Sequence, residues 1–178
     1  IGPGEPTYIV FEAGPTHEGL ESALRLVDAA ADAGADAVKF QILDAEKLVS
    51  GPDVMFSYDW LADRESGLTE TATEPLLEIL KRRELRTEEW REVIHHCRVR
   101  SISFFSTVIN EGELDFLEEH GVDTVKICSG DLTFHHFLRQ AASHSLSVQI
   151  DTGSSSLDEV DVAIRVLEKA GCERIIIN

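Results

Sequence analysis

Short apolar runs recur along the chain, separated by longer segments with helical periodicity. The runs are continuously apolar rather than alternating, which is typical of strands buried on both faces of a parallel sheet. The six runs are TYIVFEAG at 7–14, DAVKFQI at 36–42, SISFFSTV at 101–108, DTVKICSG at 123–130, SVQIDTG at 147–153 and RIIIN at 174–178. We therefore expect these segments to be strands of one sheet.

The segments between these runs place apolar residues at helical spacing, and they predict five main helices. The expected helices cover residues 20–33, 87–98, 111–120, 134–142 and 157–170. Thr87 is expected to cap the second of them, because Glu88 and Glu89 follow it in the first turn. Strands that alternate with helices predict βαβ units and an α/β fold.

Three of the predicted helices end in the same kind of corner, which reads DAGADAV, EHGVDTV and KAGCERI. In each corner a glycine ends the helix and a short turn leads into the next strand. Lys39 follows Gly34 by five residues, and Lys126 follows Gly121 by the same interval. Because an unpaired ammonium is costly to bury, two lysines at one offset in apolar strands need an explanation.

Two parallel architectures compete for this pattern. The 178-residue length favours a doubly wound sheet, because a complete (β/α)8 barrel usually needs about 250 residues. The polar residues favour a (β/α)8 TIM barrel, because polar residues at the carboxyl end of nearly every strand are typical of a barrel's active-site face. The chain would supply about the first six strands of such a barrel. These polar residues are Glu12, Lys39, Gln41, Ser106, Thr107, Lys126, Ser129, Asp131, Asp151 and Thr152. The whole of 1–178 is then an incomplete barrel catalytic domain.

The strand spacing is interrupted between Ile42 and Ser101. This interval is polar and rich in turn residues before it becomes helical. It predicts a long insertion after the second strand, and long loops at that position are often functional.

The formal net charge of -17 makes nucleic acid an unfavourable partner, and no apolar run is long enough to span a membrane. An anionic small substrate would need local positive charge, which Lys39 and Lys126 would supply if they converge. Either lysine could instead snorkel or pair with a buried acid. The three cysteines lack CxxC spacing and indicate free thiols in a reducing cytoplasm.

Three loops after strands carry further candidate chemistry. EAGPTHEG at 12–19 is either a plain turn or a site loop that contributes Glu12 and His17. SGD at 129–131 is either a helix start or a source of Ser129 and an acid/base Asp131. DTGSSS at 151–156 is a turn that resembles a phosphate-binding nest. The His-His pairs at 95–96 and 135–136 lack ligand spacing and favour solvated or hydrogen-bonded histidines.

In this order the motifs EAGPTHEG, AGADAVKFQ, FFSTV, VKICSGD and DTG resemble the N-acetylneuraminate (sialic acid) synthase family. The resemblance implies a (β/α)8 barrel that condenses phosphoenolpyruvate with an N-acyl hexosamine, forming a 2-keto sugar acid and releasing phosphate. It also implies a cytoplasmic, homodimeric enzyme that uses a divalent metal, Mn or Mg. The metal ligands of the family come after the sixth strand, so they are expected beyond residue 178.

The resemblance also assigns roles to individual residues. Glu12, Lys126 and Asp131 are the implied catalytic residues. The implied substrate-binding residues are His17, Lys39, Gln41, Thr107, Ser129, Asp151 and Thr152. Asp151 departs from the family pattern, which has a serine at this position, and a carboxylate there repels phosphate unless it is protonated or paired with a lysine.

Two other functions fit the same residues. A Schiff-base aldolase would use Lys126 as its nucleophile, and a non-catalytic barrel would bind a sugar or another subunit without releasing phosphate.

Overall fold

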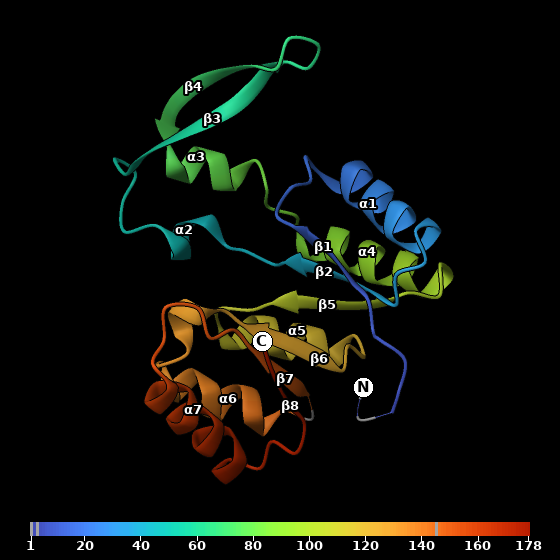
Figure 1. The fold of residues 1–178 in the computed structure, drawn as a ribbon, viewed down its shortest axis with the longest axis vertical. Helices are drawn as coiled ribbons and strands as arrows, with labels where there is room; N and C mark the ends of the chain where they lie inside the picture. The colour runs from blue at the N-terminus through green and yellow to red at the C-terminus, as the bar shows by residue number, and fades with distance from the viewer. Residues whose placement is uncertain (1, 3, 145) are drawn as a thin grey trace. The chain divides into compact units, whose positions relative to one another are not determined.

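A computed structural model describes residues 2, 4–144 and 146–178, and Figure 1 shows its fold. The chain divides into two compact units. Unit 1 comprises 1–42 and 85–178 and contains a six-stranded parallel sheet with its helices, whereas unit 2 comprises 43–84 and contains a two-stranded antiparallel sheet.

The strands of unit 1 follow the apolar runs of the sequence, and its helices follow the helical segments. The strands are β1 (Val10–Gly14), β2 (Ala37–Gln41), β5 (Ser103–Thr107), β6 (Thr124–Ile127), β7 (Ser147–Ile150) and β8 (Ile175–Ile177). The helices are α1 (Leu20–Asp32), α4 (Thr87–Val99), α5 (Glu111–Glu119), α6 (His135–Ser143) and α7 (Leu157–Lys169), with a short 3-10 helix η1 (Ser129–Asp131). The expected N-cap at Thr87 is wrong by one residue: Arg86 is the N-cap of α4, and its backbone N–H donates to Glu89 Oε2 at 2.8 Å.

The order of the strands distinguishes the two expected architectures. The sheet runs β1-β2-β5-β6-β7-β8, and every neighbouring pair is parallel. A doubly wound sheet reverses its strand order at a switch point, and this order does not reverse. Right-handed crossovers that always advance in one direction keep all helices on one side of the sheet. The sheet therefore has the topology of a partial (β/α) barrel.

Alternate residues of each strand face opposite sides of this sheet. Val38 and Phe40 of β2 are fully buried, and Phe40 stacks on Phe104 and meets Trp90 of α4 edge-on at a ring distance of 5.7 Å. The helix-covered face is thus largely apolar. Ser106, expected among the polar residues of the active-site face, instead pairs in register with Phe40 on this face and accepts a hydrogen bond from the Ile42 N–H. Lys39 and Gln41 alternate with Val38 and Phe40 and belong to the opposite face. No helix in the described residues is long and apolar enough to cross a bilayer.

The three helix-to-strand corners share one conformation. Gly34, Gly121 and Gly171 all have positive φ, at 76°, 64° and 93°. In each corner the N–H of the residue after the glycine donates to the carbonyl five residues earlier in the chain, as in a Schellman motif. The cross-strand register places the residues five positions after the glycines, Lys39, Lys126 and Ile176, on one face of the sheet. Lys39 pairs with Phe105 and Lys126 with Thr107, so the two lysines lie two residues apart in register along β5.

Unit 2 lies within the long insertion expected after the second strand, and its hairpin was not predicted from the sequence. It contains an antiparallel hairpin of β3 (Met55–Asp63) and β4 (Leu68–Pro75), together with helices α2 (Ala45–Leu48) and α3 (Leu76–Lys81). Aromatic residues at 56, 58 and 60 alternate with polar ones, which is the period of a strand. The hairpin is largely exposed on both faces, so it has no continuous apolar run by which to be recognised.

Burial of the apolar face of α7 can be tested with one substitution at two positions. Leu167 is fully buried and Leu157 is 87% exposed. We expect Leu167→Ala to lower the free energy of unfolding by about 2–5 kcal/mol, because it leaves a cavity, and Leu157→Ala to change it by less than about 0.5 kcal/mol. Urea denaturation of both variants measures the difference. Equal losses would contradict the packing of α7 against the sheet.

Candidate active site

Lys39 is the most buried charged residue at the strand ends, with 4% of its surface exposed. Its Nζ atom lies 2.6 Å from Glu12 Oε2 on β1 and 3.4 Å from Thr107 Oγ1 on β5. The parallel register explains the first contact, because Glu12 and Lys39 are partners across β1 and β2. The ammonium is thus paired with a carboxylate, as burial requires.

Lys126 forms a second ion pair on the same face of the sheet. Its Nζ atom lies 2.6 Å from Asp151 Oδ2, just beyond the end of β7. The other carboxylate oxygen of Asp151 accepts a hydrogen bond from Asn178 Nδ2 at 2.8 Å. Gln149 Nε2 in turn donates to Asn178 Oδ1 at 2.9 Å, and Thr152 Oγ1 donates to the Asn178 carbonyl at 2.6 Å. A chain of polar contacts therefore joins β6, β7 and β8.

The two ion pairs belong to one electrostatic cluster. Thr107, which contacts Lys39, is the register partner of Lys126. Burial lowers the pKa of Lys39 below its ordinary value, and the positive charge of Lys126 lowers it further, while Glu12 and Asp151 act in the opposite direction. Charged Lys39 is thus not fully compensated by its surroundings. An anion bound beside it would stabilise the ammonium form.

Burial disfavours the charged form of Asp151, yet its pKa lies below its ordinary value. The hydrogen bonds from Lys126 and Asn178, together with the positive charges of Lys126 and Lys39, outweigh the effect of burial. Asp151 is therefore a carboxylate paired with a lysine, which is one of the two conditions under which an acid is compatible with a phosphate site at this position.

The end of β2 and the loops after β6 and β7 contribute other residues proposed from the sequence. Gln41 is the register partner of Thr107. A Cβ atom added to Gly153 would lie 3.3 Å from Ser129 Oγ, so the loop after β7 touches η1. Asp131 accepts a hydrogen bond from the Cys128 thiol, whose Sγ lies 3.0 Å from Oδ2. Burial, followed by the contact with Asp131, raises the pKa of this thiol.

His17 lies apart from this cluster. It is fully buried, and its ring packs against Phe40 and Trp90 at centroid distances of 6.1 and 5.7 Å. Those two residues belong to the helix-covered layer, so the structure does not bring His17 to the face that carries the lysines. Its role in substrate binding stays a prediction.

Sequence reasoning missed Gln149 and Asn178. Gln149 interrupts an apolar run, as Lys126 does, and Asn178 directly follows the run RIII. Both residues line a hollow of about 1030 Å³ on the side of the sheet that carries Phe105, Thr124 and Ser147. The sequence signal that could have identified Gln149 is a polar residue within an otherwise apolar strand.

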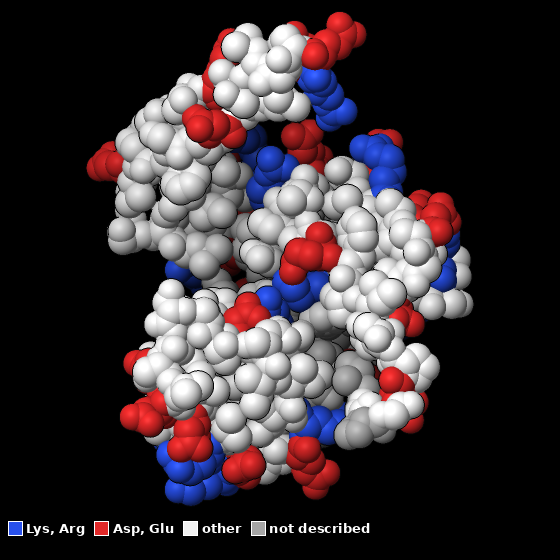
Figure 2. All heavy atoms as spheres, in the orientation of Figure 1, with Lys and Arg blue, Asp and Glu red and all other residues white. Residues whose placement is uncertain are grey.

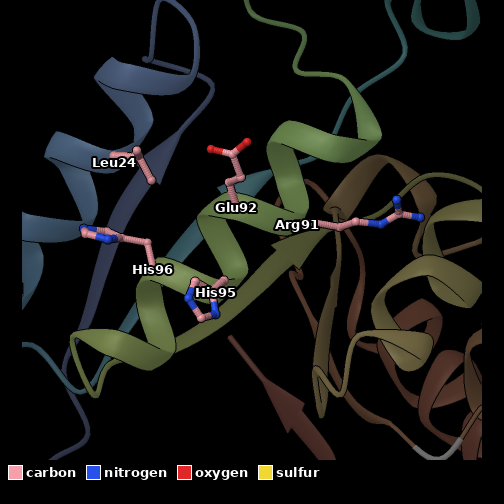
Figure 3. A pocket seen from close by; sticks show the side chains of 5 residues that line it. All are labelled: Leu24, Arg91, Glu92, His95 and His96. Atoms are coloured by element: carbon pink, nitrogen blue, oxygen red, sulfur yellow. The ribbon is translucent and has the colours of Figure 1, made fainter.

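A smaller pocket lies outside the sheet, against α1 and α4, and Figure 3 shows its lining. It has a volume of about 330 Å³ and is lined by Leu24, Arg91, Glu92, His95 and His96. His96 Nε2 lies 2.8 Å from Asp28 Oδ1, as expected for a hydrogen-bonded histidine. Figure 2 shows Lys and Arg interspersed with acidic residues on the face drawn there, not gathered in one basic surface.

The sequence profile of the NeuB family matches residues 26–178. The chain belongs to the NeuB family. It is 38% identical to the N,N'-diacetyllegionaminic acid synthase of Legionella pneumophila over 88% of this chain and 42% of that protein. It is 34% identical to the synthase of the same name from Campylobacter jejuni, over 94% of this chain and 48% of that protein.

A solved NeuB-type structure confirms the fold. The N-acetylneuraminic acid (sialic acid) synthetase of Leptospira borgpetersenii, solved in complex with citrate, superposes with a TM-score of 0.78 at 28% identity. The alignment covers 97% of this chain and 53% of that one. The chain thus spans about half the length of the relatives that it matches.

The divalent metal implied by the family has no evident site in this part of the protein. Within residues 2, 4–144 and 146–178, no group of three or more His, Cys, Asp and Glu side chains could hold a metal ion. The residues present do not fit a metal centre, and the expectation that the metal ligands lie beyond residue 178 stays a prediction.

The Lys126–Asp151 pair predicts a specific loss of stability in acid. Because the folded-state pKa of Asp151 is lowered from 3.8, its contribution is complete well above pH 3.8 and is lost as the pH falls through the lower, folded-state value. Asp151→Asn should therefore be less stable than the unmodified protein at pH 7, and the two should converge in acid. Urea titrations between neutral and acid pH measure this, with Lys126→Met as a second way to remove the pair. A constant difference at all pH values would contradict it.

Proposed function

We propose that this chain forms the phosphoenolpyruvate-binding part of a sugar acid synthase, which condenses phosphoenolpyruvate with an N-acyl hexosamine or a related aldose. The observation that carries the proposal is the convergence of Lys39 and Lys126 with Thr107 on one face, at the carboxyl ends of parallel strands. Barrel enzymes place their active sites at this end. The names of the NeuB relatives as sugar acid synthases support the same reaction class.

The cluster suits the charge changes of this reaction. Carbon 3 of phosphoenolpyruvate attacks the aldehyde carbon of the sugar, and water adds to the oxocarbenium-like centre at carbon 2. The tetrahedral intermediate then collapses to the 2-keto acid and releases inorganic phosphate. Lys39 and Lys126 would offset the carboxylate and phosphate charges throughout. Glu12 or Asp131 would accept the proton released by the attacking water and pass it to the alkoxide that forms from the sugar aldehyde, and the second proton of the water leaves with phosphate.

The Schiff-base alternative is less well supported by this geometry. A Schiff-base nucleophile must be a neutral amine, whereas Lys126 is paired with the carboxylate of Asp151 at 2.6 Å. Borohydride reduction in the presence of a keto acid would label Lys126 under that alternative. Phosphate release without such labelling supports the synthase.

Removing either lysine should weaken binding of phosphoenolpyruvate. We expect Lys39→Ala and Lys126→Ala to cost about 2–5 kcal/mol each, because each leaves an anion without a charge-assisted contact. Lys126→Arg should also impair binding, since a planar guanidinium does not replace a compact ammonium. Titration calorimetry on the natural full-length protein measures the affinity, and phosphate release with an N-acyl hexosamine measures the reaction.

Lys169→Ala is the matched control, because Lys169 is exposed at the end of α7. It should leave the affinity for phosphoenolpyruvate unchanged. An affinity that survives both Lys39→Ala and Lys126→Ala would reject the assignment of the anion site.

A further inference from the structure

We infer that Asp151 is a built-in counter-ion that occupies the ligand side of Lys126, and that Asn178 holds it there. An anionic ligand then competes with Asp151 for this lysine, so that Asp151 sets the affinity and charge preference of the site. The inference rests on the proposed function for the class of ligand. It goes beyond that function because it assigns opposite effects on anion affinity to the two lysines, which raise it, and to Asp151, which lowers it.

The two acid partners of the lysines are held differently. The side chain of Glu12 is 54% exposed, and its Oε2 contacts Lys39. The side chain of Asp151 is 29% exposed, and both of its oxygens are engaged, one by Lys126 and one by Asn178. Glu12 can therefore swing into solvent more easily than Asp151 when an anion arrives. Displacing Glu12 from Lys39 therefore costs less free energy than displacing Asp151 from Lys126.

Asn178 fixes the orientation of the Asp151 carboxylate. Because Gln149 Nε2 donates to Asn178 Oδ1 at 2.9 Å, the amide nitrogen of Asn178 is directed to Asp151 at 2.8 Å. The backbone of Asn178 is also held, since its N–H donates to the Ile150 carbonyl at 3.0 Å. Asn178 is thus a positioning residue that acts through Asp151.

The electrostatic consequence follows from the charges on this face. Glu12 and Asp151 balance Lys39 and Lys126, so the two ion pairs carry no net charge before a ligand binds. A phosphate or carboxylate at Lys126 either displaces Asp151 or lies beside a like charge, and both outcomes reduce affinity. Neutralising Asp151 leaves Lys126 available to the ligand and removes this competition.

Inorganic phosphate is the probe that tests this competition, with the natural full-length protein in a calorimeter. Asp151→Asn should bind phosphate about tenfold more tightly, which corresponds to about 1.4 kcal/mol. Asn178→Ala should shift affinity in the same direction by a smaller factor, because the carboxylate remains but is less well held. Glu168→Gln, which removes an equal charge from an exposed position on α7, should leave phosphate binding unchanged.

Thermal melting of each variant establishes that it is folded, and Asp151→Ser serves in place of Asp151→Asn if the latter does not fold. Unchanged or weaker phosphate binding in the folded Asp151 variant would overturn the inference. Tighter phosphate binding without condensation of phosphoenolpyruvate and sugar would preserve the inference and reject the proposed function. Condensation of phosphoenolpyruvate and sugar, together with an unaltered phosphate affinity in the Asp151 variant, would support the proposed function and overturn the inference.

Discussion

The cost of burying an ammonium group is the constraint on which the arrangement of this site depends. Lys39 is 4% exposed and belongs to a strand whose neighbouring residues are fully buried. Such a group is stable only beside a carboxylate or another strong acceptor. Glu12 meets this requirement for Lys39, and Asp151 meets it for Lys126. Both carboxylates come from the ends of neighbouring strands, so the parallel sheet itself supplies the compensation.

The repeated helix–glycine–strand corner links this chemistry to the fold. A glycine with positive φ ends each of three helices, and the same backbone hydrogen bond closes each corner. The cross-strand register then places Lys39, Lys126 and Ile176, each five residues after such a glycine, on one face of the sheet. Thr107 links the two lysines, because it contacts Lys39 and is the register partner of Lys126.

The hairpin of unit 2 is stabilised differently from the parallel sheet, because it buries little apolar surface. Phe56 and Trp60 of β3 are 49% and 47% exposed, and β3 pairs only with β4 in the described structure. An isolated two-stranded ribbon gains little from burial. Its order depends on cross-strand contacts such as the hydrogen bond from Tyr58 to Glu74 at 2.7 Å.

The sequence alone determined the α/β class, the order of the six strands along the chain, the repeated corners and the placement of polar residues at strand ends. Each of these is a local property, because it follows from apolar runs, glycine conformation and the sequence interval between residues. The polar strand ends favoured a barrel and an anion-binding role for Lys39 and Lys126, and the family resemblance supported both. Asp151 was expected to be either protonated or paired with a lysine, and the anion-binding role stays a prediction.

Only the tertiary structure decided which groups meet. The unreversed strand order, the pairing of Lys126 with Asp151 and the support from Asn178 all join residues far apart in the chain. Tertiary structure also separates residues that the sequence grouped together. His17 was expected at the site, and it packs against Trp90 on the helix-covered side of the sheet. Side-chain direction and cross-strand register depend on the packing of the whole sheet, so no local pattern specifies them.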